Sequence, residues 1–309
     1  MSVYTGDHIH MSHPLFRKVI PALSIVVALV AVSVAVYALT GNAPEQKLGI
    51  FLYPETILPG DPVFVTIHAT STPVEVFVDG QIVPIFLYQG VPHALYAVDF
   101  NEKVLAHEVK VVFESGEVRE VPFTITPRAK IERPIGIPEK LGGNTPVASK
   151  NLVNNLAREN AEIARVTSSV TQLWEDAFVL PLTNIFVTDD YGYDRATVGQ
   201  TIVHKGTDFR AATGTPVVAM NAGKVVLAKE FTVYGNTVIV DHGLGVHTLY
   251  MHLSHLDVKV GDTVVRGQLL GQSGVTGYAN APHLHVSLKV GGVSIDPMVF
   301  VGFWEEVDH

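Results

Sequence analysis

The chain is organised around one stretch, Ala281-Pro282-His283-Leu284-His285-Val286-Ser287-Leu288. Proline suits the first residue of a strand, and Val286 and Leu288 continue a buried-strand pattern. Because side chains alternate faces along a strand, His283 and His285 are predicted to project from the same side. Two imidazoles so placed can share one metal, or supply one ligand and one base beside it. Taken alone, the pair is more simply explained as two surface histidines, since motifs this short recur by chance.

Three side chains upstream change that interpretation. His204 and Asp208 lie four residues apart across Gly206, where a loop is predicted, and His252 lies at the end of a predicted strand. Zinc enzymes typically hold the ion with three His or carboxylate ligands and leave a fourth position for water. Bound zinc makes hydroxide available near neutral pH, and two further histidines could accept its proton and stabilise an oxyanion. The set therefore contains what metal-assisted hydrolysis at a carbonyl needs.

Composition narrows the chemistry further. The 309 residues are enough for two domains with sizeable cores. The net charge is −9 and no Lys/Arg cluster occurs, so no binding to nucleic acid is expected. With no cysteine, the chain has no disulfide, thiolate nucleophile or Cys-type zinc site, and any metal would be held by His, Asp or Glu. Phosphate-loop, Gly-x-Ser-x-Gly and His-Glu-x-x-His motifs are missing.

The N-terminal segment predicts a membrane anchor. A predicted cytoplasmic tail, residues 1–19, carries Arg17-Lys18 just before an apolar run at residues 20–39. Such a run gives a helix of about 30 Å, enough to span the bilayer core. The cations ahead of it predict a single-pass protein of the cytoplasmic membrane, with its N-terminus inside and its remainder in the periplasm or extracytoplasmic space. A cleaved signal peptide is the alternative, because Val36-Tyr37-Ala38 resembles a cleavage site, but the length of the run favours an uncleaved anchor.

The chain beyond the anchor is predicted to be mainly β. Residues 45–128 contain short runs rich in Val, Ile, Phe and Tyr that are separated by turns, and Asp79-Gly80 between two of them is a strong hairpin signal. This spacing predicts an immunoglobulin-like β-sandwich. Because no chemistry is visible there, we expect the sandwich to serve in positioning or in contact with a protein partner.

Three further segments follow the predicted sandwich. Residues 129–146 are rich in Pro and Gly and form a predicted linker. A helix is predicted over residues 147–180, because apolar residues recur at three- and four-residue steps until Pro181. Residues 181–309 have short β-type runs separated by glycines, which predicts a compact antiparallel β domain.

This last domain resembles the LytM/lysostaphin-type zinc metallopeptidases. The resemblance covers most of the domain and rests on short segments that occur in family order. These segments are residues 204–208, 214–219, 221–225, 235–238, 241–243, 248–253, 260–264, 267–271, 274–277 and 282–285.

The resemblance implies a site and an activity. It implies one zinc ion held by His204, Asp208 and His285, with His252 and His283 as catalytic histidines, one acting as base and the other steadying the tetrahedral intermediate. The implied reaction is endopeptidase hydrolysis of amide bonds in peptidoglycan stem or cross-bridge peptides, through a metal-activated water. The alternative is a non-catalytic cell-wall scaffold or activator of another wall hydrolase. Such members typically lack one or more ligands, whereas this chain has them all.

The resemblance also bears on residues outside the ligand and catalytic positions. Tyr191 matches a segment near the family's groove, so the resemblance implies a substrate contact there. Val286-Ser287 replaces the aromatic residue and Glu that usually follow the histidine pair, which bears on substrate preference more than on zinc binding. His242, His247 and His255 fall outside the family's ligand positions and are predicted to be surface or structural residues.

Overall fold

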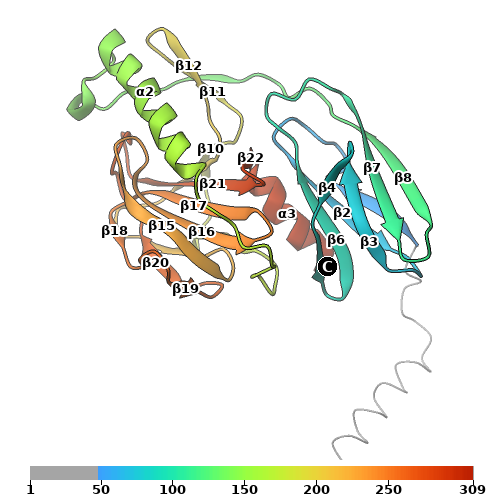
Figure 1. Ribbon diagram of the computed structural model, residues 1–309. Coiled ribbons are helices and arrows are strands. Elements are labelled where there is room, and N and C mark those ends of the chain that lie inside the picture. Colours follow the sequence, from blue (N-terminus) through green and yellow to red (C-terminus); the bar gives the residue numbers. More distant parts are fainter. Residues whose placement is uncertain (1–47, 309) are drawn as a thin grey trace, which may run out of the picture. The chain divides into compact units, whose positions relative to one another are not determined.

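The computed structural model describes residues 48–308, and residues 48–309 belong to one compact unit. The predicted tail and membrane anchor, residues 1–39, lie outside the described residues. In the described part, no helix is both long and apolar enough to cross a membrane. That part is mainly β, and its helices are α2 (Pro146–Ile163), α3 (Pro297–Val307) and a 3-10 turn at Glu139–Leu141 (Figure 1).

Two four-stranded antiparallel sheets form the N-terminal part. One has the strand order β1-β2-β6-β5 and the other β4-β3-β7-β8, and apolar side chains from both fill a common core. The Asp79-Gly80 hairpin between β3 and β4 is confirmed, with φ values of 50° and 78°. Immunoglobulin-like sandwiches use sheet orders of this kind, and that assignment stays a prediction. The strands are β1 (Gly49–Tyr53), β2 (Pro62–His68), β3 (Pro73–Val78), β4 (Gln81–Val83), β5 (Ile85–Tyr88), β6 (Val91–Ala97), β7 (Ala106–Phe113) and β8 (Val118–Thr124).

The C-terminal part is built on one large antiparallel sheet of order β10-β13-β21-β17-β16-β15-β19, with β22 paired to β21. Its strands are β10 (Val187–Asp189), β13 (Thr207–Arg210), β15 (Gly223–Phe231), β16 (Gly235–Gly243), β17 (Val246–Leu253), β19 (Thr263–Val264), β21 (His283–Val290) and β22 (Val293–Ile295). Two small sheets complete it, β12-β11-β9 and β14-β20-β18. Their strands are β9 (Glu132–Pro134), β11 (Asp194–Thr197), β12 (Gln200–Val203), β14 (Pro216–Val218), β18 (His255–Leu256) and β20 (Leu269–Gln272).

The predicted linker contributes to this fold. Its residues 132–134 form β9, which pairs in parallel with β11, and Ile137 is buried against the start of α2. A Pro- and Gly-rich composition therefore marks an extended connection here that is nevertheless packed against the C-terminal part.

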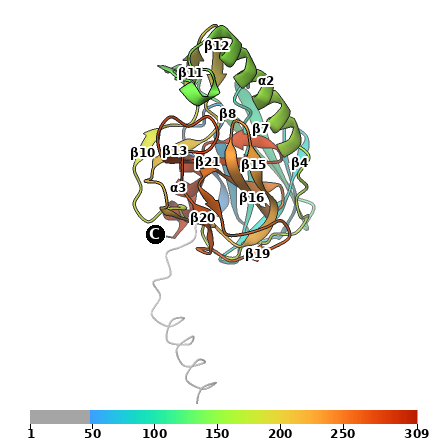
Figure 2. The ribbon, with the colours of Figure 1, turned by 90° about the vertical axis from the view of Figure 1, so that its left-hand side faces the viewer.

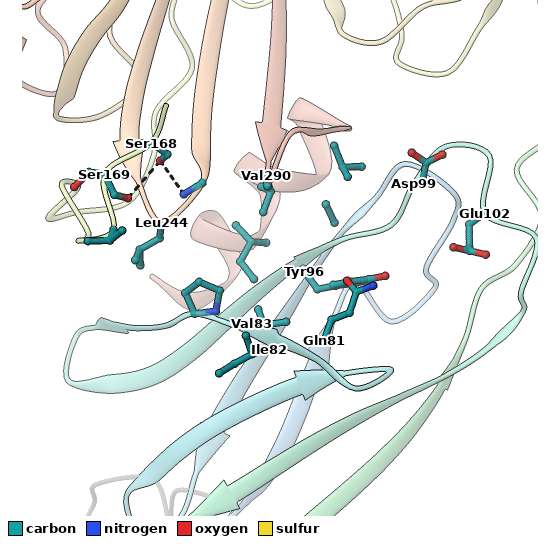
Figure 3. A pocket seen from close by; sticks show the side chains of 17 residues that line it. Gln81, Ile82, Val83, Tyr96, Asp99, Glu102, Ser168, Ser169, Leu244 and Val290 are labelled. Atoms are coloured by element: carbon teal, nitrogen blue, oxygen red, sulfur yellow. Dashed lines mark hydrogen bonds between the residues drawn. The ribbon is translucent and has the colours of Figure 1, made fainter. Parts of the chain in front are cut away.

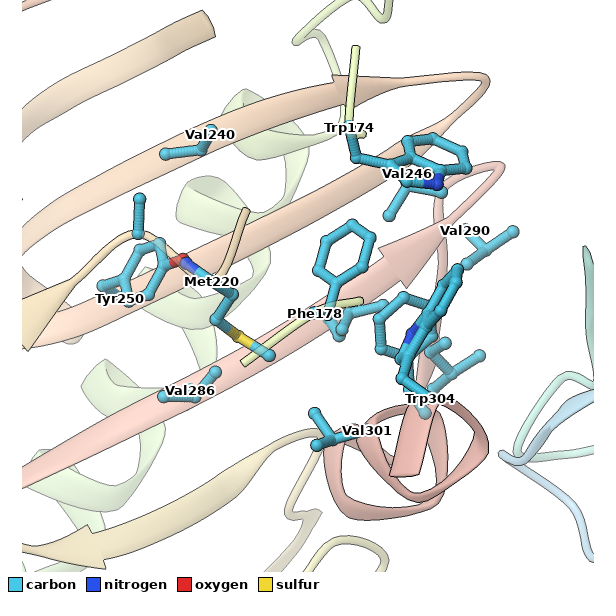
Figure 4. Close-up of a cluster of buried hydrophobic side chains, with 14 of the residues drawn as sticks. Trp174, Phe178, Met220, Val240, Val246, Tyr250, Val286, Val290, Val301 and Trp304 are labelled. Atoms are coloured by element: carbon cyan, nitrogen blue, oxygen red, sulfur yellow. The ribbon is translucent and has the colours of Figure 1, made fainter. Parts of the chain in front are cut away.

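Alternation along the strands gives the large sheet two different faces. One face carries apolar residues such as Phe209, Leu284 and Tyr250, and it packs against α3 through Phe300 and Trp304 (Figure 4). The opposite face carries Asp208, His283 and His285, since these residues alternate with the core residues on β13 and β21. Farther along this second face, Leu249 and Met251 pack against Ile163 of α2. Figure 2 shows α2 alongside this sheet. The predicted site therefore occupies the part of this face next to the region under α2.

The helix α2 starts as predicted but ends much earlier. Thr145 accepts a hydrogen bond at Oγ1 from the Ala148 N–H, and Pro146 occupies the first turn. The prediction of helix to residue 180 is wrong, because α2 ends at Ile163. The buried carboxylate of Asp241 accepts hydrogen bonds from the Ser168 hydroxyl at 2.6 Å and the Ser169 N–H at 2.8 Å. These long-range contacts hold the chain in an irregular path, so the apolar spacing imitates a helical stripe without forming one.

The two parts share a buried contact inside this compact unit. The rings of Phe64 on β2 and Phe303 on α3 stack with centroids 3.7 Å apart. Nearby, Arg128 donates to Asp61 at 2.5 Å and lies 3.6 Å from Asp296, whose side chain also caps α3. Burial raises the pKa of Asp61 to about 6, although Arg128 acts in the opposite direction. The carboxylates of Asp61 and Asp296 are therefore both paired with the guanidinium of Arg128.

A cavity of about 670 Å³ opens beside this contact (Figure 3). It is lined by apolar residues such as Ile82, Leu244 and Val290, with Asp99 and Glu102 at one end. None of the residues predicted for the site lines it. The cavity and the histidine-bearing face of the large sheet are therefore separate features of the molecule.

Candidate metal centre

The three predicted metal ligands converge in the structure. His204, Asp208 and His285 are buried, and one donor atom from each lies within 4.8 Å of the others. Asp208 Oδ1 is 3.2 Å from His204 Nε2 and 2.7 Å from His285 Nδ1, and the two nitrogens are 3.0 Å apart. Asp208 and His285 are direct partners across β13 and β21, and His204 comes from the loop before β13.

The outer ring nitrogens decide which tautomers these imidazoles adopt. His204 Nδ1 lies 2.7 Å from the Asp190 carbonyl, which can only accept, so the proton belongs on Nδ1. The Ser287 hydroxyl donates to the Lys205 carbonyl at 2.8 Å and therefore accepts from His285 Nε2, also at 2.8 Å. With these outer nitrogens protonated, the neutral form of each ring aims a lone pair inward.

The donor atoms of these three side chains are arranged as a metal ion requires. Two imidazole lone pairs and a carboxylate oxygen would face one another with no hydrogen between them, which is favourable only around a cation. Two nitrogens and one oxygen are ligand types that zinc takes, and the outer hydrogen bonds are the usual support for metal-binding histidines. The residues present therefore fit a zinc ion.

The charge state of the cluster agrees with a ligand role. Burial acts to raise the pKa of Asp208, but the imidazoles of His204 and His285 outweigh it and hold that pKa well below its ordinary value. Burial lowers the pKa of His285 to about 4, so this ring is neutral near pH 7. The other oxygen of Asp208 accepts from Arg195, which also pairs with Asp189 at 2.6 Å. The carboxylate is thereby fixed with Oδ1 facing the cluster.

The two predicted catalytic histidines lie beside the ligands. The rings of His252 and His283 have centroids 4.8 Å apart, and His283 Nε2 is 3.9 Å from Asp208 Oδ1. His252 Nδ1 donates to the Thr276 carbonyl at 2.9 Å, and His283 Nδ1 donates to the Ala281 carbonyl at 2.8 Å. In each ring Nδ1 is thereby occupied and Nε2 is left for the reaction.

An irregularity in β17 brings His252 to the correct face. The pairing of β16 with β17 shifts register between Val238 and Asn236, and His252 has a φ of 61°. A bulge of this kind turns the next side chain onto the other face of a sheet. Met251 packs on the α2 side, so regular alternation would direct His252 into the opposite core. Because of the bulge, Leu253 enters that core and His252 does not. Burial, followed by the neighbouring imidazoles of His283 and His285, lowers the pKa of His252 to about 3.

The substrate-contact prediction for Tyr191 is wrong in this structure. Its side chain is only 2% exposed, and its hydroxyl donates to the Ser294 carbonyl at 2.8 Å. Its ring packs against Gly60 and lies 5.3 Å from the Arg128 guanidinium, next to the buried contact between the two parts. The aromatic residue predicted to meet a substrate therefore stabilises the fold.

The departure from the family pattern at Val286-Ser287 is expected to bear on substrate preference more than on zinc binding, whereas the structure places Ser287 directly behind the metal ligand His285. The remaining histidines match their predictions in part. His242 is fully buried, with Nδ1 2.7 Å from the Ala222 carbonyl, and His247 is also buried. His255 is exposed on β18. Among the described residues, none of these three joins a metal-binding cluster.

Comparisons with known proteins bear on this region. Residues 202–297 match peptidase family M23. The peptidoglycan DD-endopeptidase ShyA of Vibrio cholerae is 44% identical over 95 residues, which cover 31% of this chain and 22% of ShyA. Lysostaphin of Staphylococcus staphylolyticus is 44% identical over 119 residues, which cover 36% of this chain and 25% of lysostaphin. The chain thus spans about a quarter of the curated relatives it matches.

A solved structure extends the likeness beyond the M23 region. A crystal structure named as a peptidase M23 from Pseudomonas aeruginosa is 26% identical, with a TM-score of 0.58, and covers 80% of this chain and 96% of that chain. All five predicted metal-binding and catalytic residues of the present chain fall inside the M23 region. The sequence-based resemblance to the LytM/lysostaphin-type peptidases is therefore supported by the family match.

Proposed function

We propose that this chain is a zinc endopeptidase that hydrolyses amide bonds in peptidoglycan stem or cross-bridge peptides. The observation that carries the proposal is the convergence of two inward-facing imidazole nitrogens and one carboxylate oxygen beside the two further histidines His252 and His283. The M23 match and the names of the two relatives support the reaction class and the substrate. The scaffold or activator alternative is not favoured, because every residue that the chemistry needs is present.

The metal would be one zinc ion, held by His204, Asp208 and His285. When bound, zinc supplies a Lewis acid and lowers the pKa of a water molecule from that of bulk water to about 7. The chain fixes its ligands before the ion arrives, since the Asp190 carbonyl and the Ser287 hydroxyl orient the imidazoles. Pre-orientation of this kind favours tight binding and a constant ligand geometry.

The two remaining histidines divide the proton transfers. His252 stays neutral because it is buried, and its Nε2 is free to accept the proton that the attacking water loses. The His283 side chain is 19% exposed and lies beside His252, where its Nε2, when protonated, can donate to the oxyanion of the tetrahedral intermediate. His252 then donates the proton that it accepted to the departing amine.

Location follows from the N-terminal sequence. We infer an anchor at residues 20–39 that leaves the catalytic part in the periplasm or extracytoplasmic space, where peptidoglycan lies. The N-terminal sheets are proposed to position this part or to contact a protein partner.

Digestion of purified peptidoglycan tests the proposed reaction. The zinc-loaded protein is expected to release soluble fragments with new peptide amino termini, which mass spectrometry identifies. His252→Ala and His283→Ala should each abolish this release. Release of fragments with cut glycan bonds and intact peptides, or cleavage that survives both substitutions, would contradict the proposal.

A further inference from the structure

A cationic side chain stands in the same row of the sheet as the catalytic histidine. Arg210 on β13 is the direct antiparallel partner of His283 on β21, just as Asp208 is the partner of His285. Because residues two apart share a face, Arg210 lies on the site-bearing face. Directly paired Cβ atoms are about 4.5–5.5 Å apart. The Arg210 side chain is therefore attached to the sheet directly beside that of His283.

Arg210 is available for a ligand. The residue is exposed, and no carboxylate among residues 48–308 forms an ion pair with it. Arg195 on β11 differs, since both Asp189 and Asp208 already neutralise it. Arg195 is thus neutralised within the protein, whereas Arg210 has no ion-pair partner among residues 48–308.

An aromatic ring holds this arginine in place. The guanidinium carbon lies 4.0 Å from the ring centroid of Phe186, which is itself 53% exposed. The Arg210 N–H also donates to the Phe186 carbonyl at 2.9 Å, so the two residues are tied by backbone and side chain. Stacking on a ring restricts the guanidinium while its N–H groups stay free for a planar anion.

We propose that Arg210, supported by Phe186, is an anion subsite that binds a free carboxylate of the substrate peptide. This inference rests on the proposed peptidase function and specifies its substrate. One extended residue spans about 3.3–3.6 Å, so the carboxylate belongs to a residue within about two positions of the scissile bond. Stem peptides can offer such a group as the α-carboxylate of a γ-linked glutamate or as the free carboxylate of diaminopimelate. Amidation of that group would remove the charge that Arg210 recognises.

The test uses the full zinc-loaded protein and three cross-linked stem-peptide dimers. One dimer has its carboxylates free, one has the glutamate carboxylate amidated, and one has the diaminopimelate carboxylate amidated. Chromatography gives kcat/KM for each. Because the ion pair is exposed to solvent, the free dimer should be preferred over one of the amidated dimers by up to about fivefold. The amidated dimer with the lower kcat/KM identifies the carboxylate that Arg210 binds.

Variants assign the preference to Arg210. The Arg210→Gln variant should cleave the free dimer with the kcat/KM that the wild type shows for the disfavoured amidated dimer. The Arg210→Lys variant should retain part of the preference for the free dimer. The matched control is Arg266→Gln, an exposed arginine after β19, four strands away from β21 in the large sheet. Equal cleavage of all three dimers by the wild type, or a preference that survives Arg210→Gln, would overturn the inference.

Binding separates this inference from the proposed reaction. Titration calorimetry of the zinc-loaded His252→Ala protein with the same dimers needs no turnover. If the wild type cleaves nothing, the proposed reaction fails. Carboxylate-selective binding that is lost in His252→Ala/Arg210→Gln would still support the subsite, and binding without selectivity, or no binding, would overturn it.

Discussion

Removal of the Ser287 hydroxyl should weaken zinc binding without touching a metal ligand. Ser287→Ala deletes two hydrogen bonds of 2.8 Å, one from His285 Nε2 and one to the Lys205 carbonyl. Because Ser287 is only 5% exposed and His285 is buried, water cannot readily replace the lost partner. The His285 ring is then free to rotate and to move its proton to Nδ1, which removes the lone pair that zinc needs.

The size of this effect follows from the hydrogen bonds lost. Leaving a buried N–H without an acceptor costs about 1–3 kcal/mol. Loss of an outer partner of a metal-binding histidine typically weakens metal affinity by about 10- to 100-fold. At about 1.4 kcal/mol for each factor of ten, a 10- to 100-fold loss is about 1.4–2.8 kcal/mol of zinc binding free energy, which lies within the range of about 1–3 kcal/mol from the lost hydrogen bond.

Competition with a chromophoric chelator at constant pH measures the zinc Kd directly. Ser273→Ala is the matched control, since Ser273 is fully buried and donates to the Ala212 carbonyl at 2.6 Å but contacts no ligand. Ser287→Thr retains a hydroxyl and should restore most of the affinity. A zinc Kd for Ser287→Ala within twofold of wild type, or an equal loss in Ser273→Ala, would refute this account of the ligand's support.

Two further predictions concern stability. Arg128→Ala should lower the free energy of unfolding by about 3–5 kcal/mol in urea titrations, because it leaves the buried carboxylate of Asp61 unpaired. Truncation of Arg119, which is only partly buried, should cost under about 1 kcal/mol, and equal losses in the two variants would contradict the interpretation. His107 donates from Nδ1 to Asp79 at 2.5 Å and from Nε2 to a backbone carbonyl at 2.8 Å, which requires the charged ring. Burial acts to lower its pKa, but Asp79 raises it above the ordinary 6.5, so this stabilisation is complete below pH 6.5 and is lost as pH rises through the folded-state pKa. Asp79→Asn should remove that pH dependence, and an unchanged pH dependence would disprove the assignment.

The metal site was predictable because its residues carry chemistry that few other arrangements need. His204, Asp208 and His285 were named from short motifs, and the structure brings their donor atoms together. Strand alternation also placed His283 and His285 on one face, as observed. Local rules were sufficient here because the strand pattern and the motif agree.

Other features depend on contacts that local sequence does not contain. The bulge that turns His252 toward the site arises from the pairing of β16 with β17. The irregular path that follows α2 is held by Asp241, more than seventy residues from the two serines that it binds. Tyr191 is buried by residues of the N-terminal part, far away in sequence. Each of these outcomes is decided by tertiary packing, which overrides the periodic or motif signal.

The distinction between a metal ligand and a catalytic histidine on one strand is the central claim. Elemental analysis of the purified full chain should give one zinc per wild-type molecule, and peptidoglycan digestion should be measured on the same samples. We predict that His285→Ala loses the zinc, whereas His283→Ala retains one zinc and loses turnover. Equal loss of zinc in both variants, or full turnover in His283→Ala, would contradict the account.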